Sequence, residues 1–338
     1  MPDTLPAVSV SIITYNQREL IGRAIDSVLM QEVNFPYEII IGDDCSNDGT
    51  QEVIREYQRR YPDKIQMILH PRRYNDNILG RTNNTTNLLN CRGKYTAMLD
   101  GDDYWTDPHK LQRQYDRLEA QPELSLCLHD ARMDYEVPAA PHEKRIKLVS
   151  HYIGKVPTGI YTHEDIAMRN RLSPFIGSIM FRTAYLRELP DWFYKVVAAD
   201  YALLLILSKQ GLVYYDATPG AAYYIMRRSF QRTMRKQPNV IYQELRDVVT
   251  YVQRFPATRN NGKLTKGRAR LHWHLHQRYR KKRKIVSAIR HLGYAFARDP
   301  IFSVRMVVNL VCKGFVHAFY LLRSRASRSA EKSATIRS

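Results

Sequence analysis

The first 130 residues alternate short apolar runs with helical patterns, and this alternation constrains the fold more than any other feature of the chain. The apolar runs cover residues 8–14, 38–42, 64–69, 95–99 and 124–128. Between them, apolar side chains recur at helical spacing in residues 20–31, 51–60 and 108–120. Strands separated by helices predict an α/β fold with a doubly wound, mostly parallel sheet of the Rossmann-like kind.

Polar clusters follow three of these predicted strands. The clusters are Thr14, Tyr15 and Asn16 after the first strand, Asp43 and Asp44 after the second, and Asp100, Asp102 and Asp103 after the fourth. In a doubly wound sheet, ligands bind at the carboxyl ends of the strands. We therefore expect the three clusters to meet at one edge of the sheet and to form a binding site there.

The aspartates at 100, 102 and 103 are the most specific of these clusters. Like charges packed together are costly unless a cation or a proton relieves the repulsion. Carboxylate oxygens are the ligands that Mg²⁺ and Mn²⁺ prefer, and such an ion would stabilise a diphosphate leaving group. The alternative is that these aspartates only cap the turn that follows the strand. Their place after a buried strand, with a second Asp pair after another, favours the metal site.

Two interpretations of the Asp43–Asp44 pair stay open. The pair precedes Ser46-Asn-Asp-Gly-Thr50, which is typical of a polar turn leading into a helix. A carboxylate at this position can also accept hydrogen bonds from a nucleobase. Tyr15 likewise either stacks on that base or covers the edge of the sheet.

Charge is distributed unevenly along the 338 residues. The chain has 52 Lys and Arg against 33 Asp and Glu, a net charge of +19, and residues 259–338 hold 20 of the basic and 2 of the acidic residues. The tail therefore carries +18 and the body, residues 1–258, carries +1. A tail of this kind needs an anionic partner or abundant solvent.

Targeting and redox signals are weak in this sequence. The first residues show no signal-peptide pattern, and no run of 18 apolar residues occurs. Cys45, Cys91, Cys127 and Cys312 form no CxxC pair, so reduced thiols in a cytoplasmic protein are the expectation.

Four segments in a fixed order resemble the family 2 glycosyltransferases of the GT-A fold. They are residues 8–16 (VSVSIITYN), 24–31 (AIDSVLMQ), 38–50 (EIIIGDDCSNDGT) and 93–105 (GKYTAMLDGDDYW). The likeness extends over about residues 7–235. It implies a hexosyltransferase-type enzyme that moves a sugar from a nucleoside diphosphate, with UDP as the expected carrier, to a glycan or lipid-linked acceptor. The reaction would serve cell-surface polysaccharide synthesis.

The resemblance also implies residue roles in the donor site. Thr14, Tyr15 and Asp43 match positions that hold the nucleoside base, with Asn16 beside them and Asp44 as the substitute for Asp43. Asp102 and Asp103 match the DxD-type pair that contacts the ribose and the metal, with Asp100 next to them. The cofactor implied is Mn²⁺ or Mg²⁺.

Asp200 and a pair of arginines complete the residues that the resemblance implies. Asp200 matches the general base of inverting members, although Ala199 stands where those members often have Glu. Because an apolar run follows it, Asp200 is also a candidate helix cap. Arg227 and Arg228 are candidates for contact with the diphosphate, the alternative being solvated surface charge.

We expect three parts in the chain. Residues 1–235 form the GT-A catalytic domain, residues 236–323 a basic amphipathic helical extension, and residues 324–338 a disordered tail. Helical patterns at about 285–297 and 302–322 pair apolar faces with basic side chains, which is typical of helices on an anionic membrane surface. The alternative is a helical subdomain packed on the body. The favoured location is the inner face of the plasma membrane, with peripheral attachment.

Two other functions fit parts of the sequence. A sugar-nucleotide nucleotidyltransferase also combines a Rossmann-like sheet with metal-binding carboxylates, but it normally has a Gly-rich loop after the first strand, where this chain has residues 14–20 without glycine. A nucleic-acid-binding protein would explain the charge of +19, yet the motifs of the body are acidic. We therefore expect no nucleic-acid partner.

Overall fold

The computed structural model describes residues 5–73, 81–135, 148, 156–167, 175–191, 193–195, 199–225 and 285–298. The chain divides into two compact units, residues 1–248 and 249–338. Arg227, Arg228, the predicted domain boundary at 235, the second tail helix and the predicted disordered end lie outside the described residues.

Four parallel strands form the first half of the sheet, in the order β3-β2-β1-β4. They are β1 (Val8–Thr14), β2 (Tyr37–Asp43), β3 (Ile65–Leu69) and β4 (Tyr95–Asp100). Strands β1, β2 and β4 are almost entirely buried. Strands covered on both faces have nearly continuous apolar sequences, and that pattern predicted each of these strands to within a residue or two.

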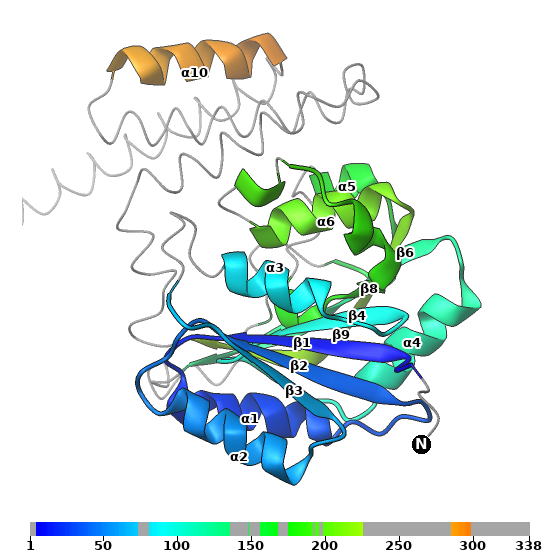
Figure 1. Ribbon diagram of the computed structural model, residues 1–338. Helices are drawn as coiled ribbons and strands as arrows, with labels where there is room; N and C mark the ends of the chain where they lie inside the picture. The colour runs from blue at the N-terminus through cyan, green and yellow to red at the C-terminus, as the bar shows by residue number, and fades with distance from the viewer. Residues whose placement is uncertain are drawn as a thin grey trace, which may run out of the picture. The chain divides into compact units, whose positions relative to one another are not determined.

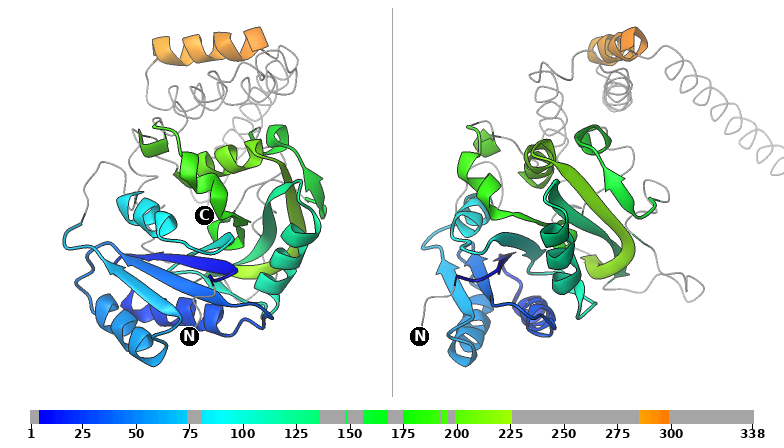
Figure 2. Two further views of the ribbon diagram at one scale, coloured as in Figure 1. Left: turned by 45° about the vertical axis from the view of Figure 1, so that its right-hand side comes forward. Right: turned by 90° about the vertical axis from the view of Figure 1, so that its right-hand side faces the viewer.

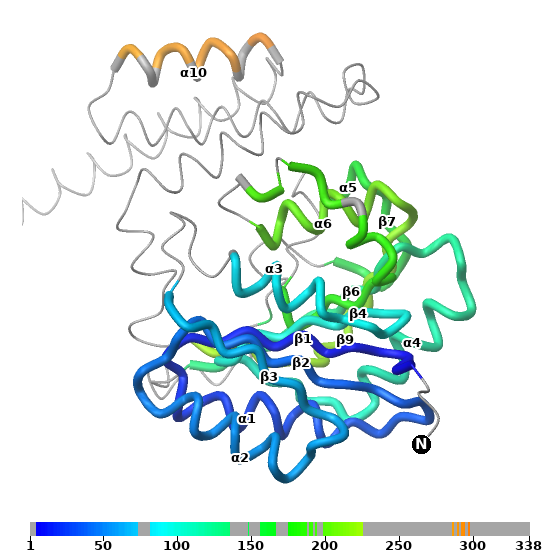
Figure 3. The backbone as a smooth tube through the Cα atoms, in the orientation of Figure 1, coloured from blue at the N-terminus to red at the C-terminus, as the bar shows by residue number. Residues whose placement is uncertain are grey.

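Helices cover both faces of this parallel half (Figure 1). Helices α1 (Arg18–Leu29) and α2 (Thr50–Arg60) lie together on one face, and α3 (Arg81–Leu89) lies on the other, as the tube in Figure 3 also shows. α1 presents a buried apolar stripe to the sheet, and both predicted helices on this face are confirmed.

Helix α3 meets the sheet through polar side chains. Asn83 Nδ2 donates a hydrogen bond to the carbonyl oxygen of Gly42, at 2.9 Å. Asn87 Nδ2 donates to the carbonyl oxygens of Ile12 and Ile40, at 3.0 and 2.9 Å. Both amides are buried, so these bonds hold α3 to β1 and β2 together with the buried side chain of Leu88.

The second half of the sheet mixes strand directions. β8 (Met180–Arg182) runs antiparallel to both β4 and β6 (Leu124–Tyr135), and β6 runs parallel to the long β9 (Leu212–Ile225). β5 (Tyr104–Trp105) and β7 (Gly159–Tyr161) pair antiparallel with β9. The predicted α/β class is confirmed, and the strand predicted at 124–128 continues to residue 135.

Three further α-helices are described in the first unit and one in the second. α4 (Lys110–Ala120) follows β5, and α5 (His163–Ala167) and α6 (Ala199–Lys209) contact each other (Figure 2). Short 3₁₀ segments cover Ile176–Ser178, Thr183–Glu188 and Phe193–Lys195. In the second unit, α10 spans Ile285–Arg298. None of the helices within the described ranges is long and apolar enough to cross a membrane.

Candidate functional site

Three aspartates gather where β4 ends. Asp100 is the last residue of β4, and Asp102 and Asp103 lie in the turn that leads to β5. One carboxylate oxygen from each lies within 4.8 Å of the others. Asp103 Oδ1 accepts a hydrogen bond of 2.8 Å from the backbone N–H of Tyr224, whereas Oδ2 is buried and has no hydrogen-bond partner. Three hard oxygen donors, one of them buried and unpartnered, fit a divalent cation.

The surroundings of this cluster favour neutral carboxyls in the absence of a cation. Burial, followed by the charges of Asp102 and Asp200, raises the pKa of Asp100 to about 8. Burial, followed by Asp102 and Asp100, raises the pKa of Asp103 well above its usual range, although the Tyr224 N–H and Arg23 act against the shift. Burial also raises the pKa of Asp102. A bound cation would supply the positive charge that this group of carboxylates lacks.

The turns after β1 and β4 pack against each other. Thr14 Oγ1 donates a hydrogen bond of 2.7 Å to Gln17 Oε1, and the Gln17 side chain is near enough to Asp102 to oppose the rise in its pKa. Gly101 sits against both residues of the first turn, and a Cβ atom there would lie 2.6 Å from Gln17 Oε1. The close approach of these two turns therefore requires glycine at 101. The polar clusters that follow these two strands lie side by side.

Asp43 and Asn16 brace the turns that follow β2 and β1. Asp43 accepts hydrogen bonds from the Ser46 backbone N–H (2.8 Å), from the Ser46 hydroxyl and from Gln51 Nε2 (2.7 Å). The Asn16 N–H donates to Ser46 Oγ at 2.8 Å, and Asn16 Oδ1 accepts from the backbone N–H of Asn47 at 3.0 Å. The observed contacts of Asp43 thus fit the turn interpretation, because its carboxylate already accepts hydrogen bonds from Ser46 and Gln51.

Asp44, Tyr15 and Arg73 form a second polar group. The Arg73 guanidinium lies 3.9 Å from the centroid of the Tyr15 ring and donates a hydrogen bond of 3.1 Å to its hydroxyl. Arg73 Nε is 3.9 Å from Asp44 Oδ2, and the Asp44 side chain is almost fully buried. Arg73 is not among the residues predicted from the sequence, because it follows β3 and none of the recognised motifs lies at the end of that strand.

Asp200 lies in the first turn of α6 and is exposed. Its Oδ1 accepts a hydrogen bond of 2.8 Å from the backbone N–H of the next residue, Tyr201, whereas a helix cap accepts from the second or third residue that follows it. Its charge also contributes to the raised pKa of Asp100, so Asp200 is within electrostatic range of the acidic cluster. The Asp200 carboxylate therefore lies at the start of α6, is open to solvent and is near the three aspartates.

Arg23 is a second cation that the sequence analysis missed. Its guanidinium lies between the rings of Tyr104 and Tyr224, 4.1 and 4.4 Å from their centroids. Arg23 Nη2 also donates a hydrogen bond of 3.4 Å to the carbonyl oxygen of Asp102. Tyr104 in turn hydrogen-bonds Asp134 and Arg132. Arg23 therefore ties α1 to the acidic turn and to the end of β9.

Ser27 of α1 and Gln31, two residues after the end of that helix, hold the segment that follows the aspartates. Ser27 Oγ accepts a hydrogen bond of 3.0 Å from the backbone N–H of Trp105. Gln31 donates to the carbonyl oxygen of Asp107 at 2.8 Å and accepts from the N–H of Leu111 at 3.0 Å. These side chains, which belong to the motif at 24–31, position the acidic turn rather than a ligand.

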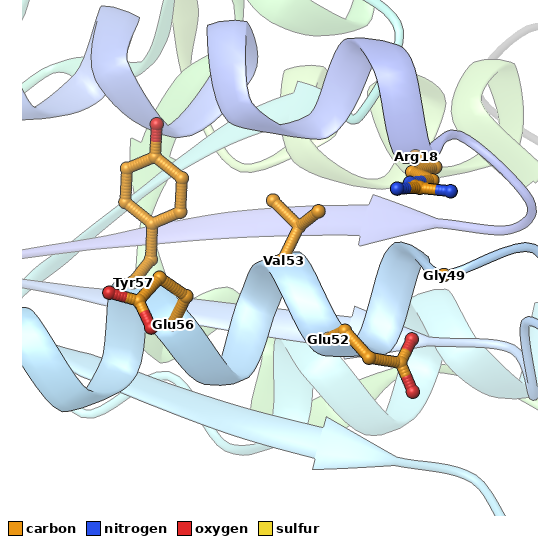
Figure 4. Close-up of a pocket in the computed structure, with 6 residues that line it drawn as sticks. All are labelled: Arg18, Gly49, Glu52, Val53, Glu56 and Tyr57. Carbon is orange, nitrogen blue, oxygen red and sulfur yellow. The ribbon is translucent and has the colours of Figure 1, made fainter.

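A cleft of about 440 Å³ opens between α1 and α2 (Figure 4). Its lining residues are Arg18, Gly49, Glu52, Val53, Glu56 and Tyr57. It shares no residue with the acidic cluster or with the Tyr15 group, so it is not part of the candidate site.

Solved structures of low sequence identity share this fold. A mannosyltransferase from Pyrobaculum calidifontis, solved with GDP-mannose and Mn²⁺, superposes with a TM-score of 0.56 at 16% identity over 93% of this chain and 82% of its own. The Staphylococcus aureus protein TarS, residues 1–349 with UDP, gives a TM-score of 0.52 at 16% identity, covering 87% and 91%. Both likenesses establish the fold, which is GT-A.

Sequence relatives are more similar but overlap only part of the chain. An uncharacterized protein of Mycobacterium tuberculosis is 42% identical over 136 residues, which are 40% of this chain and 38% of the relative's length. TuaG of Bacillus subtilis, a glycosyltransferase assigned to teichuronic acid biosynthesis, is 35% identical over 34% of this chain and 42% of its own. An uncharacterized glycosyltransferase of Methanocaldococcus jannaschii is 33% identical over 209 residues, 60% of this chain and 68% of its own.

The family model described as glycosyl transferase family 2 matches residues 9–185. That range includes the acidic cluster, the Tyr15 group and the α1 side chains that hold the acidic turn. Together with the archaeal relative, the match shows that this chain belongs to glycosyl transferase family 2.

Proposed function

We propose that residues 1–235 form a metal-dependent, inverting glycosyltransferase of the hexosyltransferase type. The donor is a sugar on a nucleoside diphosphate, UDP being the first candidate, and the acceptor is a hydroxyl of a glycan or a lipid-linked sugar. The main support is the acidic cluster at the end of β4, in which Asp103 Oδ2 is buried without a partner.

Asp100, Asp102 and Asp103 are the side chains that would hold Mn²⁺ or Mg²⁺, with Asp102 also near the ribose. A bound divalent ion would offset the charge that develops on the departing diphosphate. Arg23 keeps the turn that carries these aspartates in place through its bond to the Asp102 carbonyl oxygen. Arg227 and Arg228 remain candidates for contact with the same diphosphate.

The transfer step needs a base on the acceptor side of the sugar. In this proposal Asp200 takes the proton of the acceptor hydroxyl while the acceptor oxygen forms a bond to the anomeric carbon. The bond from that carbon to the diphosphate oxygen breaks, and its electron pair leaves with the diphosphate. The exposure of Asp200 and its electrostatic reach to Asp100 support this assignment.

The nucleobase would bind beside Tyr15, with Asp44 and Arg73 as its polar partners. Tyr15 offers a ring for stacking, and Arg73 and Asp44 offer a donor and an acceptor in the same group. Thr14, Asn16 and Asp43 shape the two turns around this place through the hydrogen bonds described above. Asp43 is thus assigned mainly to the turn, with the base contact passing to Asp44.

A role in cell-surface polysaccharide synthesis fits the name of one relative. TuaG is assigned to teichuronic acid biosynthesis, and the S. aureus and P. calidifontis structures hold UDP and GDP-mannose, respectively. These relatives leave both UDP and GDP as nucleotides to be tested for this chain.

Calorimetric titration of the full chain with UDP, and then with GDP, tests this proposal. Each titration is run with and without Mn²⁺ on the wild type and on Asp103→Asn and Asp200→Asn. Asparagine at 103 keeps an oxygen for the Tyr224 N–H but weakens the metal site. We expect metal-dependent binding of one nucleotide that falls at least about tenfold in Asp103→Asn and is retained in Asp200→Asn.

Asp63→Asn, at an exposed position away from the site, is the matched control. Equal binding with and without Mn²⁺ would contradict the metal site, and loss of binding in Asp200→Asn would contradict the base assignment. Binding of neither nucleotide would overturn the donor assignment.

A further inference from the structure

Helix α10 turns an apolar face toward solvent. Val286 is 73% exposed, Ile289 63% and Tyr294 44%. With 100° between successive residues, these three fall on one side of the helix together with Arg290, Gly293 and Ala297, all of them exposed. The exposed side of α10 is therefore mostly apolar and carries one cation.

Large apolar side chains grouped on one exposed face usually mark a contact surface. Single exposed apolar residues are ordinary, but Val286 and Ile289 stand one turn apart and Tyr294 extends the same face along the helix. Gly293 lies on this face too, and a Cβ atom there would meet nothing within 4 Å. The face is therefore open to solvent at Gly293.

The sequence on either side of α10 indicates what the partner is. Six of the seven residues in Arg278–Lys284, directly before the helix, are basic, and residues 259–338 carry a net charge of +18. A surface that combines apolar side chains with a dense positive charge complements an anionic lipid bilayer, which offers acyl chains beside negative headgroups. A protein partner would need specific acidic positions to match the same charge.

We propose that the exposed face of α10 is a membrane-binding surface that takes anionic lipid. The helix would lie flat in the headgroup region, with Val286, Ile289 and Tyr294 directed toward the acyl chains. The basic sequence on either side of the helix would supply the positive charge that attracts anionic headgroups. The 14 residues of the helix extend only about 21 Å, too short for the hydrocarbon core of about 30 Å. This attachment does not depend on the identity of the sugar donor.

Flotation of the full chain with lipid vesicles tests the proposal. One vesicle set is phosphatidylcholine alone, and the other contains about one third phosphatidylglycerol. We expect binding to the anionic set only, weakened by added salt. The double change Val286→Glu with Ile289→Glu should lower the bound fraction at least about tenfold, because charged side chains would replace the apolar contact.

Gly293→Leu supplies the opposite change. The added side chain enters open space on the same face and should raise binding to anionic vesicles several-fold, with circular dichroism reporting whether the helix content is kept. Leu5→Glu, at a residue of the first unit that is 71% exposed, is the matched control and should bind as the wild type does.

Each alternative partner gives a different result. Equal flotation of the wild type and the double variant would overturn the proposal, as would equal binding to both vesicle sets. A dimer seen by light scattering without lipid, and lost in the double variant, would show that the face binds a second copy of the chain. Failure of nucleotide binding would leave this result unaffected.

Discussion

Arg23 shows how one side chain can connect three parts of the site. Its guanidinium contacts the rings of Tyr104 and Tyr224 and hydrogen-bonds the backbone of Asp102. In that position it also opposes the upward pKa shifts of Asp102 and Asp103. A cation near partly buried carboxylates stabilises them in their charged form, and two aromatic faces hold it with little freedom.

Replacement of Arg23 with Met should therefore destabilise the protein. We expect the free energy of unfolding to fall by about 1–3 kcal/mol, from two lost cation–π contacts and one lost hydrogen bond. Urea denaturation without added metal measures the change. Arg117→Met is the matched control, because Arg117 contacts a single ring, that of Tyr214, at an exposed position. Equal losses in the two variants would contradict the bridging role of Arg23.

The predicted and the missed residues differ in where their signal lies. Asp100, Asp102 and Asp103 were predictable because they directly follow an apolar strand. One short segment therefore shows both their place at the end of a strand and their carboxylate side chains. Arg23 carries no such signal, since its partners lie on β5 and β9, far along the chain. Contacts of this kind depend on strand order, which local sequence does not determine.

Among the helices and strands, α3 and β2 show again that contacts between distant segments are not determined by local sequence. The sequence between residues 74 and 90 predicts only a mixture of loop and helix, because the described buried side chains of α3 are mostly polar, three asparagines and Thr85, with Leu88 as the one large apolar residue. Those asparagines take the space that a side chain at Gly42 would need. A Cβ atom at Gly42 would lie 2.2 Å from Asn83 Oδ1 and 2.9 Å from Asn87 Oδ1.

Gly42→Ala should consequently push α3 away from the sheet. We expect a loss of about 1–3 kcal/mol in the free energy of unfolding, because the buried amide bonds to β1 and β2 lengthen or break. Gly22→Ala is a control of opposite sign, since a Cβ atom there meets Tyr57 at an ordinary 3.4 Å within helix α1. That variant should gain about 0.5–1 kcal/mol. An unchanged free energy of unfolding in Gly42→Ala would contradict this prediction and would show that α3 can shift without loss of stability.

The strands of the second half of the sheet were harder to predict than the four parallel strands of the first half. β1 through β4 alternate with helices, and the spacing of that alternation gives both element type and sheet direction. β8 has three residues and β5 two, which is too few to show the alternation of apolar and polar residues that marks a strand. The pairing of β9 with β6 is a contact between distant segments, which the local sequence does not indicate. The whole sheet therefore depends on contacts between segments far apart in sequence.

At the scale of the whole molecule, buried titratable groups make stability depend on pH in opposing directions. Asp100, with its pKa raised to about 8, binds a proton in the folded state between its ordinary pKa of 3.8 and about 8, so this group favours folding as the pH falls. His129 acts the other way. Burial, followed by the charge of Lys110, lowers its pKa from 6.5 to about 3, and its Nε2 has no hydrogen-bond partner.

Between pH 6.5 and about 3 the unfolded chain binds a proton at His129 that the folded protein does not, so this residue lowers stability as the pH falls. From pH 7 to pH 5 its share is about 2 kcal/mol. His129→Asn removes that share, so the difference in unfolding free energy between wild type and variant should shrink by about this amount over the same range. Asp100 and the other carboxyls contribute equally to the pH dependence of both proteins, so their contributions cancel in the difference. Urea denaturation of both proteins at the two pH values measures the change in this difference. Parallel pH curves for wild type and His129→Asn would mean that the buried imidazole is protonated or solvated in the folded protein.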